Sequence, residues 1–226
     1  DLDLNEAQVR LKLVKSVYEL KDWKGVLAEG QQCIEKAALS SQVAEVRFLM
    51  AEANKKLGMY QEAIQQTLEL LNTEQERAGK DPDNWAYWQK RTGNKLANEL
   101  YEQGDYINAL LIYETLFKLP GNAEWHSQAL YQIGLIYERM FQPDRASAAY
   151  TEIISQSTNA APVLNNVAKS SAAYSTNLTP SVQPPSATSE NKATSQTPAQ
   201  PVSSGLNLIR EMAQWRLDNL RWDRNV

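Results

Sequence analysis

Residues 128–154 read QALYQIGLIYERMFQPDRASAAYTEII, and this stretch predicts a pair of helices joined by a tight turn. Two apolar stripes at helical spacing lie on either side of the helix breaker Pro143. The small residues Gly134 and Ala146 would let the two helices approach closely, while bulky neighbours fill the space around them. The remaining apolar positions are Leu130, Ile133, Tyr137 and Tyr150.

The same arrangement occurs four times along the chain. In each copy a polar or helix-breaking turn precedes a residue that begins a new apolar stripe. The spacings between these residues are 37, 46 and 37, so the sequence predicts a stack of about four helical hairpins with insertions. The longest spacing predicts that the helix ending near Arg77 and the helix beginning at Asn84 are both extended. The repeating residues are Val26, Ala63, Ala109 and Ala146.

This pattern resembles the tetratricopeptide repeat family, in which a Trp-x2-Leu-Gly-x2-Tyr helix is followed by an Ala-x3-Phe helix. The resemblance covers residues 5–155 and implies an all-α, TPR-like α-solenoid. At the level of single repeats the chain is similar to bacterial cell-envelope proteins of this family. The matching positions are Leu13, Val17 and Val26 in the first copy, Met50, Ala51 and Ala63 in the second, Leu96, Ala97, Leu100, Ala109 and Tyr113 in the third, and Leu130, Ile133, Gly134, Tyr137, Ala146 and Tyr150 in the fourth.

Composition divides the chain into three parts. Residues 1–155 form the repeat domain. Residues 156–204 are dominated by Ser, Thr, Pro and Ala and have few charges, so they are predicted to be a disordered linker. Residues 205–226 are amphipathic again and predict a C-terminal helix that caps the last repeat of its own chain or of a neighbouring copy. Its docking positions are Leu206, Ile209, Met212, Ala213, Trp215, Leu217 and Leu220.

Charge and residue counts exclude several classes of function. The net charge of -4 lacks the positive surplus that nucleic-acid binding needs, so no nucleic-acid partner is expected. One cysteine, Cys33, and one histidine, His126, leave no disulfide framework and no usual zinc site. No phosphate-binding glycine loop or catalytic triad is recognisable. We therefore expect no enzyme, no catalytic residue, no cofactor, no metal and no transmembrane span.

Binding of a protein partner is the better-supported hypothesis. The resemblance implies a concave face lined by the first helix of each repeat, and there Asn94 and Asn98 could bond a peptide backbone while Arg91 and Arg139 meet an acidic group. The second repeat would add Phe48 and Glu52. The spaced lysines of the family's chaperone-binding members are missing, so that activity does not carry over. The full candidate set is Arg91, Asn94, Asn98, Tyr101, Gln128, Tyr131, Glu138 and Arg139.

Two functions remain open at this point, and a third reading has the linker of residues 156–204 lying in the groove as a ligand of its own chain. The first is a non-enzymatic scaffold that binds a peptide or helix of a partner within a larger bacterial envelope assembly. The alternative is a structural, self-assembling subunit whose C-terminal helix docks on a neighbouring copy, which would make the protein a homo-oligomer. A periplasmic or cell-envelope location is expected from the repeat-level resemblance, with the cytoplasm as the alternative.

Overall fold

The computed structural model describes residues 6–36, 40–72, 81–155 and 204–223, and its regular structure there is α-helical throughout. This confirms the all-α prediction for those residues. The predicted disordered linker lies almost entirely outside them. The helices are α1 (Glu6–Glu19), α2 (Trp23–Lys36), α3 (Gln42–Lys56), α4 (Tyr60–Asn72), α5 (Pro82–Glu102), α6 (Tyr106–Phe117), α7 (Ala123–Arg139), α8 (Pro143–Ser155) and α9 (Ser204–Asp223).

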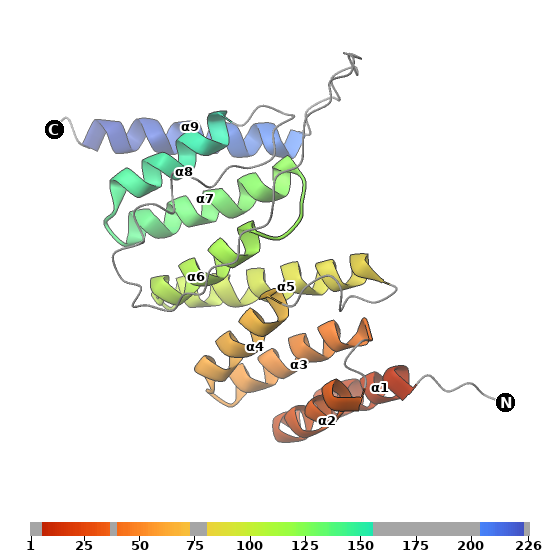
Figure 1. Cartoon of the computed structure of the whole chain (residues 1–226). Helices are drawn as coiled ribbons and strands as arrows, with labels where there is room; N and C mark the ends of the chain where they lie inside the picture. The colour runs from red at the N-terminus through yellow and green to blue at the C-terminus, as the bar shows by residue number, and fades with distance from the viewer. Residues whose placement is uncertain (1–5, 37–39, 73–80, 156–203, 224–226) are drawn as a thin grey trace, which may run out of the picture.

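The first eight helices form four hairpins stacked in chain order, and α9 lies beyond the last hairpin (Figure 1). Each hairpin packs against the next, and the first helices also contact one another across the pairs α1–α3, α3–α5 and α7–α9. This arrangement is a helical-repeat solenoid. We call the surface shared by the first helices and α9 the inner face.

Four turns with the same geometry set the repeat. Residues in the left-handed region follow the first helix of every hairpin: Lys21, Gly58, Gly104 and Phe141, separated by 37, 46 and 37 residues. The next N–H in each turn bonds the carbonyl oxygen five residues back, as in the usual left-handed C-terminal motif of a helix. The spacing found in the sequence is therefore the spacing of the turns.

Side-chain caps fix where α5, α6 and α7 begin. Asp81, Asp105 and Asn122 accept hydrogen bonds from backbone N–H groups three residues ahead, at 3.1, 3.3 and 2.9 Å. The cap at Asp81, with Pro82 in the first turn, begins a 21-residue α5, so the predicted extension of that helix is confirmed. The structure describes α4 as far as Asn72, and the predicted end near Arg77 lies outside the described residues.

Small residues let the helices of a hairpin touch, as predicted. A Cβ atom at Gly134 would lie 2.4 Å from Cε1 of Tyr150, whose ring is fully buried between α7 and α8. The first hairpin needs one correction. Val14 is fully buried and Leu13 is 44% exposed, so Leu13 does not belong to the buried stripe of α1. Val17 packs against the core and Val26 is fully buried, as predicted. Adjacent apolar residues at positions 13 and 14 made both registers compatible with the sequence.

The core of the described residues falls into separate clusters along the stack. One cluster joins α1, α2 and α3, and a much larger one runs from α4 to α9. A small third cluster around Trp85 lies between α3, α4 and α5. Apolar packing between the second and third hairpins therefore runs mainly through α4, while polar side chains share the interface of α3 and α5 with Trp85 and Trp88.

Candidate partner-binding face

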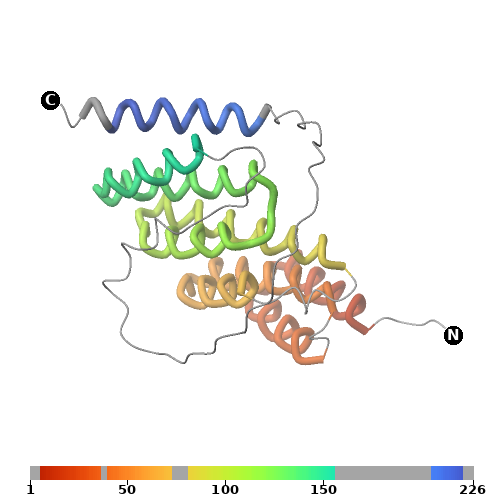
Figure 2. The backbone as a smooth tube through the Cα atoms, turned by 45° about the horizontal axis from the view of Figure 1, so that its top comes forward, coloured from red at the N-terminus to blue at the C-terminus, as the bar shows by residue number. Residues whose placement is uncertain are grey.

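Helix α9 takes the position that the first helix of a fifth hairpin would have. It packs on α8 and α7 of its own chain, as α3 packs on α2 and α1, and Figure 2 shows it lying along the last hairpin. One row of side chains is buried in this contact, and Met212 and Leu220 pack half-buried beside it. The buried row consists of Leu206, Ile209, Ala213 and Leu217.

Trp215 departs from the expected docking set. Its side chain is 62% exposed, and Leu208 on the same side of α9 is 56% exposed. The two residues belong to a second apolar stripe, seven residues apart, that points away from α8. The prediction that Trp215 docks on the solenoid is therefore wrong for this side chain, since the other row already fills the contact.

Beside this exposed stripe the inner face is hollowed between α7 and α9. One hollow of about 300 Å³ is lined by residues of both helices, among them Gln128, Tyr131 and Leu208. A second hollow of about 410 Å³ shares Tyr131 and Leu208 and adds Trp215. Both are mainly apolar, and Met212 contributes to each. The structure thus brings two predicted partner-binding residues, Gln128 and Tyr131, next to a surface that the sequence had assigned to docking.

Glu138 has a different role from the predicted one. Its carboxylate accepts a 2.6 Å hydrogen bond from the hydroxyl of Tyr150. It also forms an ion pair with Arg216 of α9, at 3.1 Å. Burial raises the pKa of the Tyr150 hydroxyl, and the hydrogen bond to Glu138 raises it further. Glu138 therefore ties α9 to the last hairpin and is no open contact for a partner.

The remaining candidates on α5 and α7 lie on the inner face with few partners of their own. Asn98 is exposed and accepts a 2.6 Å hydrogen bond from the Tyr113 hydroxyl, while its amide nitrogen has no partner in the described residues. Arg139 donates to the hydroxyl oxygen of Tyr101 at 3.0 Å, which links α7 to α5. Asn94 is half-buried and has no side-chain hydrogen bond in the described part of the chain.

Arg91 is exposed on α5 and is held by aromatic rings. Its guanidinium carbon lies 5.5 Å from the ring centre of Phe48, 5.6 Å from that of Trp88 and 5.8 Å from that of Tyr87. The Tyr87 hydroxyl accepts a 2.6 Å hydrogen bond from Nη1. Such contacts hold a guanidinium by its faces and leave its in-plane N–H groups available.

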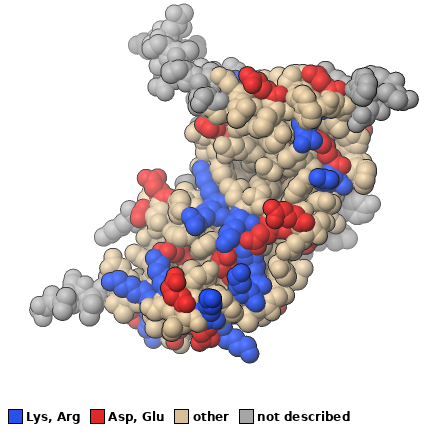
Figure 3. All heavy atoms as spheres, turned by 180° about the vertical axis from the view of Figure 1, so that it is seen from behind, with Lys and Arg blue, Asp and Glu red and all other residues tan. Residues whose placement is uncertain are grey.

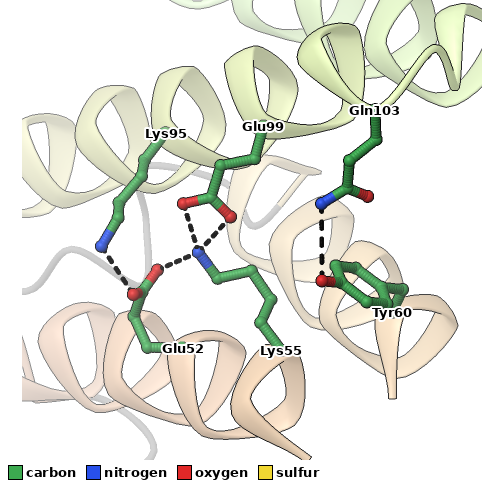
Figure 4. A network of polar contacts seen from close by, with 6 residues as sticks. All are labelled: Glu52, Lys55, Tyr60, Lys95, Glu99 and Gln103. Atoms are coloured by element: carbon green, nitrogen blue, oxygen red, sulfur yellow. Dashed lines mark hydrogen bonds and ion pairs between the residues drawn. The ribbon is translucent and has the colours of Figure 1, made fainter. Parts of the chain in front are cut away.

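A network of ion pairs joins α3 to α5 beside Arg91 (Figure 4). Glu52 is buried and accepts from Lys55 and from Lys95, the latter at 2.6 Å, and Lys55 also reaches both oxygens of Glu99 at 2.7 and 2.8 Å. Burial works against the charged form of Glu52, but the hydrogen bonds from Lys55 and Lys95 hold its pKa below the usual range. Glu52 and Phe48, expected at the surface of the inner face, are thus buried within it.

The histidine and the cysteine have structural surroundings. His126 is buried against Phe117, and its two ring nitrogens lie 2.9 and 3.2 Å from the backbone oxygens of Asn122 and Leu119. Cys33 is fully buried, and burial raises the pKa of its thiol. In the described ranges no group of three or more His, Cys, Asp or Glu side chains could hold a metal ion. None of the helices described here is long and apolar enough to span a membrane.

The architecture defines the chain as an all-α helical-repeat protein. Within it, a family model described as the tetratricopeptide repeat matches residues 128–160, which contain most of α7 and all of α8. The matched stretch is the one with the buried pair Gly134 and Tyr150. The comparison with curated proteins gave no match. Tetratricopeptide repeats generally mediate contacts between proteins, so a protein partner is indicated.

Proposed function

We propose that this protein is a non-enzymatic scaffold that binds a peptide or helix of a partner along the inner face. Support comes from the family match at residues 128–160 and from the way α9 extends the inner face beyond α7. The observation that carries the proposal is the hollowed apolar surface formed by Tyr131, Leu208, Met212 and Trp215. Large apolar side chains gathered at a hollow on a folded chain are typical of an interaction site.

The geometry favours an elongated ligand. Arg91 and Asn98 on α5 are exposed on the same inner face as the hollows between α7 and α9, so one extended segment could contact both regions. Apolar anchors in the hollows would provide most of the binding free energy, because a few buried side chains usually dominate an interface. The amide groups of Asn94 and Asn98 would fix the register of the bound backbone.

Site-specific photocrosslinking tests this proposal. A photoreactive amino acid replaces Leu208 on the inner face or, as a control, Ile107, which is 72% exposed on α6. We expect a protein partner to crosslink from position 208 in the native cell and not from position 107. The purified partner should then bind Trp215→Ala at least tenfold more weakly than the wild type, with Ile107→Ala unchanged. Equal crosslinking from both positions would refute the proposal.

The same experiment separates the self-assembling alternative. In this structure α9 packs on its own chain, with Arg216 bonded to Glu138. Crosslinks only between copies of the chain, together with a dimer by light scattering that is lost in Ile209→Asp, would favour self-assembly through α9.

We further propose that the scaffold works in a bacterial cell envelope, on the repeat-level resemblance alone. Fractionation of the native cell tests this location. Recovery of the protein with cytoplasmic markers would contradict it.

A further inference from the structure

The cationic region of the inner face points to the chemistry of the partner, and this inference rests on the proposed function. Figure 3 shows the side of the molecule opposite to Figure 1, where Lys and Arg side chains gather over the lower part, at the level of α1 to α5. The whole chain has a net charge of -4, so this grouping runs against its overall charge.

Several cations of this region are already paired with carboxylates. Lys15 pairs with Glu45 at 2.7 Å, Lys55 with Glu52 and Glu99, and Lys95 with Glu52. Arg91 differs from these lysines. In the described residues its partners are three aromatic rings and one tyrosine hydroxyl, and no carboxylate is among them.

The surroundings of Arg91 prepare it for an anion. Its side chain is ordered by the contacts with Phe48, Tyr87 and Trp88, so less conformational entropy is lost when a ligand binds. The guanidinium keeps donors in its plane that match the two oxygens of a carboxylate. Half of Tyr87 remains exposed beside it, which supplies an apolar surface for the neighbouring part of a ligand.

The adjacent network adds no net positive charge to the site. Glu52 and Glu99 balance Lys55 and Lys95, so a ligand with many negative charges, such as a nucleic acid, would leave most of them unpaired there. One carboxylate flanked by apolar or aromatic side chains fits both the guanidinium of Arg91 and the rings around it.

We propose that the inner face of α5 binds a peptide segment of the partner through one acidic side chain, with Arg91 donating two hydrogen bonds to its carboxylate. Asn94 and Asn98, one helical turn apart on the same helix, bond the backbone of that segment. The apolar residues that follow it reach the hollows between α7 and α9. The partner segment is therefore acidic at one position and apolar on the side toward α9.

Selection from a displayed library of random twelve-residue peptides tests the inference with the full chain. We expect the selected peptides to be enriched in Asp or Glu at one position next to apolar residues. Replacing that acid with its amide in a selected peptide should weaken binding at least tenfold. The unmodified peptide should lose the same factor in binding to the Arg91→Gln protein. Its loss with Arg91→Lys should be intermediate, because lysine keeps the charge but lacks the planar guanidinium.

Lys24→Gln is the matched control, because it removes one positive charge from an exposed position on α2. Circular dichroism of each variant establishes that the helices are intact. Selected peptides without acid enrichment would overturn the inference, and so would an Arg91→Gln protein that binds like the wild type or a Lys24→Gln protein that loses as much. These results leave the photocrosslinked partner of position 208 unaffected, so the proposed function is judged separately.

Discussion

Replacement of Glu52 by Gln should destabilise the fold more than an ordinary surface change, because Glu52 is the buried anion between α3 and α5. The variant removes the charge that Lys55 and Lys95 share. The Lys55 side chain is only 7% exposed, and a hydrogen bond between charged buried groups contributes about 1.5–3 kcal/mol. Lys95 is 44% exposed and can turn into water, so its share is at most about 1 kcal/mol.

The expected loss is therefore about 2–3 kcal/mol in the free energy of unfolding. It stays below the 3–5 kcal/mol of a fully orphaned buried charge, because Lys55 keeps Glu99 as a partner. Urea denaturation followed by circular dichroism measures the loss. Glu6→Gln is the control, since it breaks an exposed pair with Arg10 and should cost about 0.5 kcal/mol or less. A Glu52→Gln protein as stable as this control would refute the reasoning.

The difference in the free energy of unfolding between the wild type and Glu52→Gln should depend on pH. The pKa of Glu52 in the folded protein lies below its ordinary value of 4.5. The unfolded chain therefore takes up a proton more readily than the folded one, and the stabilisation is complete above pH 4.5 and lost as the pH falls through the lower folded pKa. Wild type and Glu52→Gln should accordingly differ at pH 7 and converge in acid.

Three further changes have clear expectations. Gly134→Ala should destabilise by about 1–3 kcal/mol, because the buried ring of Tyr150 cannot move aside, whereas Gly205→Ala meets only a flexible carboxylate and should be neutral or stabilising; thermal unfolding compares the pair. Thr67→Val should raise the urea midpoint, because the fully buried hydroxyl has no partner in the described residues, and an unchanged or lower midpoint would contradict this. Burial raises the pKa of Tyr137 to about 12. The folded state therefore holds this proton more tightly, so stability should fall between pH 10 and 12 in wild type and fall less in Tyr137→Phe, as alkaline unfolding curves would show.

The repeat could be predicted because its signals are local. The turns at Lys21, Gly58, Gly104 and Phe141 are spaced as the apolar stripes are, and the tight contact of Gly134 follows from residue size within one hairpin. In α1 the prediction placed Leu13 instead of Val14 in the buried stripe, since both residues fit a helical stripe and only the packing against the neighbouring helices selects between them.

The candidate site depended on contacts that no local pattern contains. Glu138 lies on the predicted face, yet it is occupied by Arg216, 78 residues further along the chain. In α9 the sequence indicated two apolar stripes but not which one docks. Periodicity shows which side chains can be buried and not which element buries them. The aromatic surroundings of Arg91 likewise combine α3 and α5, which only the stacking of two hairpins brings together.

The polar share of the interface between α3 and α5 has a mechanical consequence. Dispersion and burial resist separation over a whole surface, whereas an ion pair weakens once its atoms are drawn apart and water enters. Under tension along the stack, we expect the ion pairs at Glu52 to yield before the apolar contacts that α4 makes with the third hairpin, so this interface would open from its α3–α5 side into two blocks. A bound segment that contacts both blocks would then hold them together, so the molecule would be stiffer when the inner face is occupied.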